Sequence, residues 1–180
     1  MKLFFRIIFK MFLIITILTG CETTQQIKET DPDALLNQGI AFAKKGQYDR
    51  AIANFNKAIE INPKYVEAYY NRGLAYERKG QYDKAISDYT KAIELNPRFA
   101  GAYNNRGVRY KLKDQYDKAI SDFTKAIEIN PKIALVYVNR GLTHFLKGQY
   151  EMACSDLKRA CELGMCKSYE DLKGFDVCKE

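Results

Sequence analysis

A period of 34 residues runs through most of this sequence. The dipeptide Asn-Pro begins at residues 62, 96 and 130, and the pair Gln-Tyr recurs at the same step. Four glycines share the period: Gly39, Gly73, Gly107 and Gly141. The period divides the chain into four units: 32–65, 66–99, 100–133 and 134–167. Because one unit of this size cannot bury its apolar face alone, we expect the four units to stack on one another.

Each unit has the pattern of two helices joined by a turn. On a helical wheel, positions 4, 8 and 11 of a unit share one face, and in the second unit they hold Tyr69, Gly73 and Tyr76. The glycine has no Cβ, which lets the second helix approach closely, and alanines at positions 20 and 27 do the same from the second helix. Glycine ends the first helix in three units, and Asp114 stands there in the third. Proline stops the second helix.

These units resemble the tetratricopeptide repeat (TPR), a helix-turn-helix of 34 residues. The second unit, VEAYYNRGLAYERKGQYDKAISDYTKAIELNPRF, is similar to it almost throughout. The resemblance implies an all-α fold, a right-handed superhelical solenoid of four helix-turn-helix repeats whose first helices line a concave groove. It also implies an interaction scaffold that binds other proteins, not an enzyme, with no cofactor and no small-molecule substrate.

Two departures from the family pattern form charged rows in the last three units. Position 7, usually Leu, is Arg, and position 23 is Asp. The residues are Arg72, Arg106, Arg140, Asp88, Asp122 and Asp156. One interpretation is an Arg–Asp bridge between the two helices of each unit, and the other is a row of ligand-binding arginines.

The groove is predicted from positions 2, 5, 6, 9, 12 and 13, which lie opposite the packed face of the first helix. Position 6 is Asn in every unit, beside apolar residues at position 9. The predicted peptide-binding residues are Asn37, Asn71, Asn105, Asn139, Tyr70, Leu74, Val108 and Leu142. Because an amide both donates and accepts hydrogen bonds, an Asn row suits the backbone of an extended peptide. The alternative is that these amides hold neighbouring repeats together.

Some TPR domains clamp the C-terminal carboxylate of chaperones with a set of Lys, Asn and basic residues in the groove. Of the corresponding positions in this chain, only Asn71 matches. We therefore do not expect carboxylate clamping of that kind.

Residues 1–20 have the pattern of a secretory signal peptide. Positive residues precede the apolar stretch 11–18, which is too short to span a bilayer. Residues 18–21, LTGC, resemble the lipobox of bacterial lipoproteins. This implies cleavage before Cys21 and its lipidation, with an ordinary cleaved signal as the alternative. Residues 21–31 would then be a lipidated Cys and a flexible tether. The resemblance implies a periplasmic, lipid-anchored envelope protein, and Glu22 favours the outer over the inner membrane.

The charge excludes one class of partner. The formal net charge is +7 over 180 residues, and three of the positive residues lie in the predicted signal. So mild a charge on an exported protein argues against nucleic-acid binding. No second long apolar run follows the signal, which excludes a multi-span membrane protein.

The other cysteines all lie near the C-terminal end: Cys154, Cys161, Cys166 and Cys178. An even number in an exported protein favours disulfides. Two bridges would hold residues 168–180 as a short C-terminal cap on the last repeat. Of three possible pairings we prefer Cys161–Cys166 with Cys154–Cys178. A zinc site is the rival, although no C-x2-C pair is present, and free or intermolecular thiols are a third possibility.

These patterns predict a membrane-anchored scaffold that binds an extended peptide segment of a partner protein during assembly of an envelope machine. One alternative is a homo-oligomeric structural protein of the envelope. Another is a cell-wall-acting enzyme, for which no polar catalytic cluster stands out. His144, the only histidine, takes position 11, where tyrosines pack in other units, so we expect it to be half-buried with a packing role.

Overall fold

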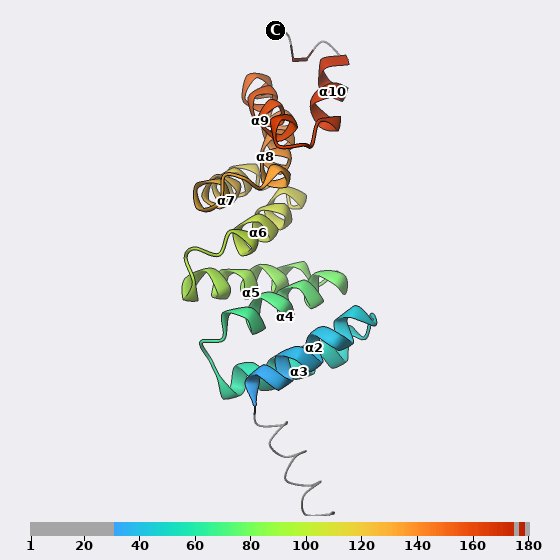
Figure 1. Cartoon of the computed structure of the whole chain (residues 1–180), viewed down its shortest axis with the longest axis vertical. Helices are drawn as coiled ribbons and strands as arrows, with labels where there is room; N and C mark the ends of the chain where they lie inside the picture. Colours follow the sequence, from blue (N-terminus) through green and yellow to red (C-terminus); the bar gives the residue numbers. More distant parts are fainter. Residues whose placement is uncertain (1–30, 175–176, 179–180) are drawn as a thin grey trace, which may run out of the picture.

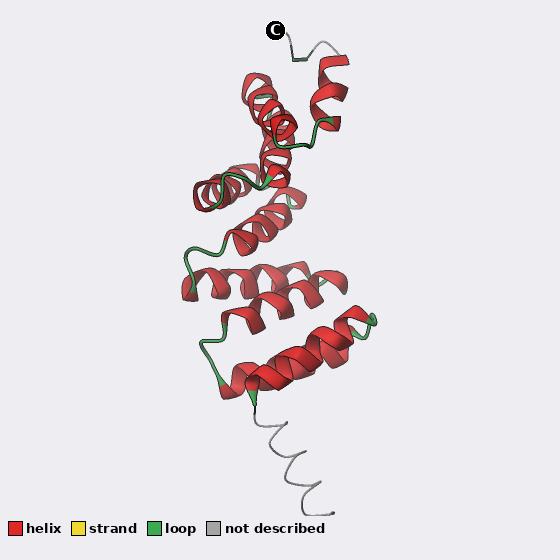
Figure 2. Cartoon of the chain, viewed as in Figure 1, coloured by secondary structure: helices red, strands yellow, loops and turns green. Residues whose placement is uncertain are grey.

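The chain folds into helix pairs that follow one another along a single path, from α2 and α3 at one end to α9 and α10 at the other (Figure 1). We describe residues 31–174 and 177–178 of a computed structural model. These residues form helices joined by short loops, with no strand among them (Figure 2). The helices are α2 (Pro32–Lys44), α3 (Tyr48–Ile61), α4 (Val66–Arg78), α5 (Tyr82–Leu95), α6 (Ala100–Leu112), α7 (Tyr116–Ile129), α8 (Ala134–Leu146), α9 (Tyr150–Glu162) and α10 (Lys167–Gly174).

Each pair from α2–α3 to α8–α9 lies inside one 34-residue unit, and its two helices are the most extensively packed neighbours in the chain. The turn within each pair needs one residue in the left-handed region. Gly80, for example, has φ +72°, and Asp114 takes the same conformation with φ 56°. The predicted fold class, an all-α solenoid of four helix-turn-helix repeats with a short cap, is therefore confirmed.

Each Asn-Pro junction between repeats contains the same kind of hydrogen bond. The side chain of Asn62 accepts a bond from the backbone N–H of Lys64 at 3.1 Å. The side chains of Asn96 and Asn130 likewise accept a bond from the backbone N–H two residues later in the chain. This local turn, together with the following proline, ends the second helix and starts the chain into the next repeat.

The core of each repeat is a close approach between a glycine of the first helix and a large side chain of the second. A Cβ on Gly107 would lie 2.8 Å from Cε1 of Phe123, closer than real Cβ atoms come. Phe123 is fully buried, as are the alanines one turn before and after it, Ala119 and Ala126. The periodic Gly and Ala residues are thus the positions where the two helices can meet without side chains between them.

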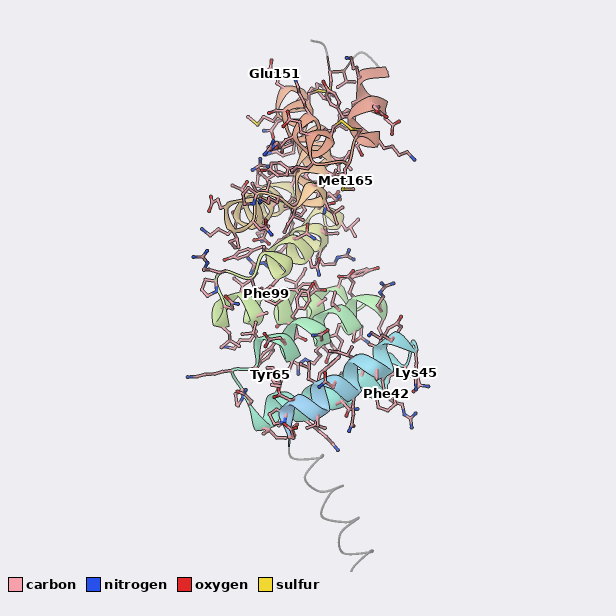
Figure 3. The ribbon with its side chains drawn as sticks, in the orientation of Figure 1. Phe42, Lys45, Tyr65, Phe99, Glu151 and Met165 are labelled. Carbon is pink, nitrogen blue, oxygen red and sulfur yellow. A yellow bond between two sulfur atoms is a disulfide. The ribbon has the colours of Figure 1, made fainter. Side chains whose placement is uncertain are left out.

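Ion pairs join each repeat to the next, between the end of a first helix and the start of the second helix in the preceding repeat. Lys79 bonds to Asp49, and the same pair recurs one and two repeats later: Lys113 with Asp83, and Lys147 with Asp117. Lys45 stands at the lysine position in the first repeat, and Glu151 stands at the aspartate position in the last. They lie toward opposite ends of the molecule (Figure 3).

The C-terminal cap is formed by α10, which packs against α9. Cys154 is bonded to Cys178 and Cys161 to Cys166, which is the preferred pairing of the three that the sequence allows. Tyr169 and Leu172 of the cap pack on the last hydrophobic cluster, whose side chains come from α8 and α9. Within the described residues, no helix is long and apolar enough to cross a membrane.

Candidate protein-binding groove

A cavity of about 420 Å³ opens between the first helices of the first two repeats. Its lining comes from α2, α4 and the start of α3: Ile40, Ala43, Lys44, Tyr48, Asn71, Leu74, Ala75 and Arg78. Ala75 is buried and Ile40 and Leu74 are half-buried, whereas Lys44 and Arg78 are exposed. The deep part of the cavity is therefore apolar, and its outer part carries positive charge.

The sequence places these residues together by helical spacing. Ile40, Ala43 and Lys44 are three and four residues apart, so they share one face of α2. The same spacing puts Asn71, Leu74 and their neighbours in the lining on one face of α4. Because α2 and α4 contact each other, the two faces meet across the cavity. Apart from Tyr48 and Ala75, the lining residues stand at predicted groove positions.

The corresponding space between α4 and α6 is filled by Arg109. This residue stands where Ala75 stands one repeat earlier, and its guanidinium carbon lies 5.2 Å from the centre of the Tyr82 ring. Its Nη2 is 3.5 Å from Oε1 of Glu77, and Oε2 of the same carboxylate accepts a bond from Tyr89 at 2.9 Å. A long cation thus closes the second site, while alanine leaves the first one open.

The predicted Asn row splits into two groups. Asn105 donates to the hydroxyl of Tyr70 at 3.1 Å, and Asn139 donates to the side-chain oxygen of Asn104 at 3.0 Å. Asn104 in turn donates to Asn105 at 3.1 Å, so one chain of hydrogen bonds runs through repeats 2, 3 and 4. In this part of the row the amides hold neighbouring repeats together.

The N-terminal half of the row is different. The Asn71 amide donates only within its own helix, to the carbonyl of Glu67 at 2.8 Å, and its side chain lines the cavity. Asn37 is exposed and lies outside the cavity lining. Asn71 is therefore the member of the row that is placed against open space between two repeats.

The predicted apolar residues also divide between cavity and packing. Leu74 lines the cavity. Tyr70 packs between repeats, 4.6 Å from the ring of Phe99, and burial raises the pKa of its hydroxyl. Val108 and Leu142 pack against the clusters of the third and fourth repeats.

Position 13 of the units is a predicted groove position, but its four residues are not among the predicted peptide-binding residues. They are Lys44, Arg78, Leu112 and Leu146. The two leucines are 61% and 54% exposed, so the groove edge changes from positive to apolar along the molecule. Lys111 precedes Leu112 on α6, and its pKa is lowered by burial and by the nearby charge of Arg109.

The arginines at position 7 form bridges, as the first of the two interpretations predicted. Arg72, Arg106 and Arg140 each bond to both carboxylate oxygens of the Asp at position 23, at 2.7–2.8 Å. The bonds to these carboxylates raise the pKa of each arginine. With their donors occupied and their carboxylate partners buried, these arginines do not form a ligand-binding row.

His144 is more buried than expected, at 8% exposure, and its Nδ1 lies 2.7 Å from the side-chain oxygen of Gln149. The described residues hold no group of His, Cys, Asp and Glu side chains suited to a metal ion. The predicted lipidation site Cys21, the predicted signal 1–20 and the first part of the tether lie outside the described residues.

Comparison with known proteins supports the repeat assignment. Sequence models described as TPR repeat and tetratricopeptide repeat match residues 39–80, 66–99, 100–133 and 123–155. No curated protein matches the chain.

Solved structures of MamA have a similar fold. One covers 82% of this chain and 86% of its own, at 28% identity and a TM-score of 0.74. A second, MamA from Desulfovibrio magneticus RS-1, covers 74% of this chain and 76% of its own, at 28% identity and a TM-score of 0.69. The repeats and these neighbours support a scaffold for protein–protein interactions. The chain belongs to the tetratricopeptide repeat family.

Proposed function

We propose that this scaffold binds an extended peptide segment of a partner protein in the groove between its first helices. The observation that carries the proposal is the open cavity between α2 and α4, with Leu74 and Asn71 in its lining. An apolar wall with a few polar groups around it is typical of binding sites. In such a site Leu74 contacts a side chain, and the Asn71 amide bonds to the peptide backbone.

We further propose that the protein works at the bacterial envelope, anchored on the periplasmic side by a lipid on Cys21, at the outer rather than the inner membrane. The lipobox-like LTGC after a short apolar stretch supports this part of the proposal. Several acyl chains would hold the protein stably at a membrane. The scaffold would then collect a partner at that surface during assembly of an envelope machine.

Two experiments test the two parts. For the anchor, Cys21→Ser should abolish acyl labelling and release the protein from the membrane fraction. Labelling and sedimentation that persist in the variant contradict the lipid anchor.

For the groove, a photo-crosslinking side chain in place of Tyr48, which lines the cavity, should capture a partner in intact cells. The matched control carries the same group at Lys91, exposed on the second helix of the next repeat. Capture from Lys91 alone would place the interface on the opposite side. Capture only of further copies of the chain from position 48 would favour the homo-oligomeric alternative.

A further inference from the structure

The two cations on the cavity rim differ from the lysines that link successive repeats. One residue after Arg78, Lys79 forms an ion pair with Asp49 of the preceding repeat, and the next two repeats copy this pair. Among the described residues, no carboxylate pairs with Lys44 or Arg78. Both side chains are exposed and line the cavity, whose lining contains no acidic residue.

The apolar part of the cavity lies one helical turn before these two charges, because Ile40 precedes Lys44 on α2 and Leu74 precedes Arg78 on α4 by four residues each. Ile40 and Leu74, from α2 and α4, line it together with two alanines. Its volume of about 420 Å³ is within the usual range for ligand pockets, roughly 300–1,000 Å³. A matching ligand must therefore present an apolar group and a negative charge close together.

We propose that the partner segment is acidic and aliphatic: an aliphatic side chain packs against Ile40 and Leu74, and carboxylates beside it bond to Lys44 and Arg78. This deepens the proposed function and rests on it. The site lies in the first two repeats, and one repeat later Arg109 occupies the corresponding space between α4 and α6. Charge complementarity of this kind selects the partner and speeds its association.

The Asn71 amide completes the site. Its Nδ2 donates to the carbonyl of Glu67, while its Oδ1 has no hydrogen-bond partner among the described residues. That oxygen accepts a backbone N–H of an extended segment lying across α4. An aliphatic side chain, its flanking carboxylates and one backbone N–H thus have separate places on the same helix pair.

The test uses the purified full chain and a short fluorescent peptide of alternating Glu and Leu, followed by fluorescence anisotropy. A second peptide has Gln in place of Glu, and a third has Ser in place of Leu. The acidic aliphatic peptide should bind more tightly than either. Its affinity should fall when the salt concentration is raised from about 50 to about 500 mM, because salt screens exposed charges.

The rim variant Lys44→Gln with Arg78→Gln should weaken binding of the acidic aliphatic peptide by about tenfold. Its matched control is Lys64→Gln with Arg98→Gln. That control removes one Lys and one Arg from the same two repeats, at exposed positions outside the cavity lining. It should leave the affinity unchanged. An equal loss in both variants would mean a general attraction to positive charge and would overturn the proposal.

A filling variant tests the apolar part. Ala43→Phe copies Phe145, which stands at the same position of the fourth repeat. It should weaken binding by about tenfold without lowering the melting temperature. Unchanged binding by this variant places the peptide elsewhere.

The remaining outcomes separate this proposal from the function on which it rests. If the Gln peptide binds as well as the Glu peptide and Ala43→Phe weakens both, the groove binds peptides but the acidic class is wrong. If no peptide binds and crosslinks come only from Lys91, both proposals fail. If the chain self-associates and the rim variant makes it monomeric, the occupant is a second copy, and the partner class proposed here is wrong.

Discussion

Arg106 and Asp122 form a two-point ion pair between the two helices of the third repeat, with both nitrogen–oxygen distances 2.8 Å. The same guanidinium donates to the hydroxyl of Thr90 in the preceding repeat at 3.0 Å. It also lies 5.7 and 5.8 Å from the ring centres of Tyr103 and Tyr110. One side chain therefore joins two helices and two repeats, in place of the Leu that is usual at this position in the family.

Replacing Arg106 by Leu should lower the free energy of unfolding by about 3 kcal/mol, because it leaves the buried Asp122 carboxylate without its partner. The double variant Arg106→Leu with Asp122→Ala should recover most of that loss, since no charge then stays buried and unpaired. Urea unfolding followed by circular dichroism measures both. Losses that simply add would show that the two residues are not coupled.

The chain should become more stable when Asp114 is replaced by glycine, the residue that its counterparts in the other repeats have. Its φ of 56° is left-handed, which is unfavourable for a residue with a Cβ by about 1 kcal/mol. Asp114→Gly removes this strain and loses the exposed bond from Tyr116, so the net gain in unfolding free energy should be about 0.5 kcal/mol. Thermal unfolding measures the change.

The control for this effect is the reverse substitution in the second repeat. Gly80→Asp places a Cβ at φ +72° and should lower the unfolding free energy by about 1 kcal/mol. Nothing lies within 4 Å of the Cβ that would be added there, so crowding does not contribute. Equal melting temperatures for Gly80→Asp and the parent chain would remove the conformational argument at both positions.

The repeat fold could be predicted from the sequence because its determinants recur. A glycine that must meet an aromatic ring, an alanine that must face another helix and an Asn-Pro junction each appear at a fixed step. The Arg–Asp bridges were one of the predicted alternatives because their residues also recur at fixed positions of the repeat. Positions 7 and 23 flank the packed faces of the two helices, so the charges of Arg72 and Asp88, for example, lie within reach of each other.

The cavity could not be predicted in the same way, because it depends on side chains that break the period. Ala75 leaves the space open, and Arg109, at the same position of the next repeat, fills it. The repeat pattern does not show whether Arg109 points into solvent or lies over the Tyr82 ring, as it does in the structure. Nor does it show that Asn105 bonds to Tyr70 of the preceding repeat. Two signals were available in the sequence: the change from Ala75 to Arg109, and the change at position 13 from cations to leucines.

The two central asparagines should therefore behave differently when changed to Ala. Asn105→Ala removes its bonds with Tyr70 and Asn104, which should lower the unfolding free energy by about 1–2 kcal/mol and leave peptide binding by the folded protein intact. Asn71→Ala removes only a bond within its own helix. It should leave stability unchanged and weaken peptide binding by about fivefold, equivalent to about 1 kcal/mol.

Thermal unfolding and anisotropy on the same preparations measure this difference. Equal effects of Asn71→Ala and Asn105→Ala on binding would show that the whole row contacts the peptide. A loss of stability in Asn71→Ala would make its amide a structural group like that of Asn105.

The two disulfides should contribute unequally to the stability of the cap. Cys154 and Cys178 are 24 residues apart, and Cys161 and Cys166 only 5. In the chain-entropy account a bridge stabilises by restricting the unfolded chain, more for a longer loop. Replacing the Cys154–Cys178 pair by Ser should therefore cost about 3.5 kcal/mol, and replacing the Cys161–Cys166 pair about 2 kcal/mol.

The loss of stability should be local to α9 and α10, because the last repeat contacts only its neighbours. Hydrogen exchange of these two helices measures it, with α4 as the internal reference that should not change. Intact mass after alkylation without reduction is the accompanying control, and it should show none of the four thiols modified. Four alkylated thiols in protein taken from the envelope would show that the cap is held by packing alone.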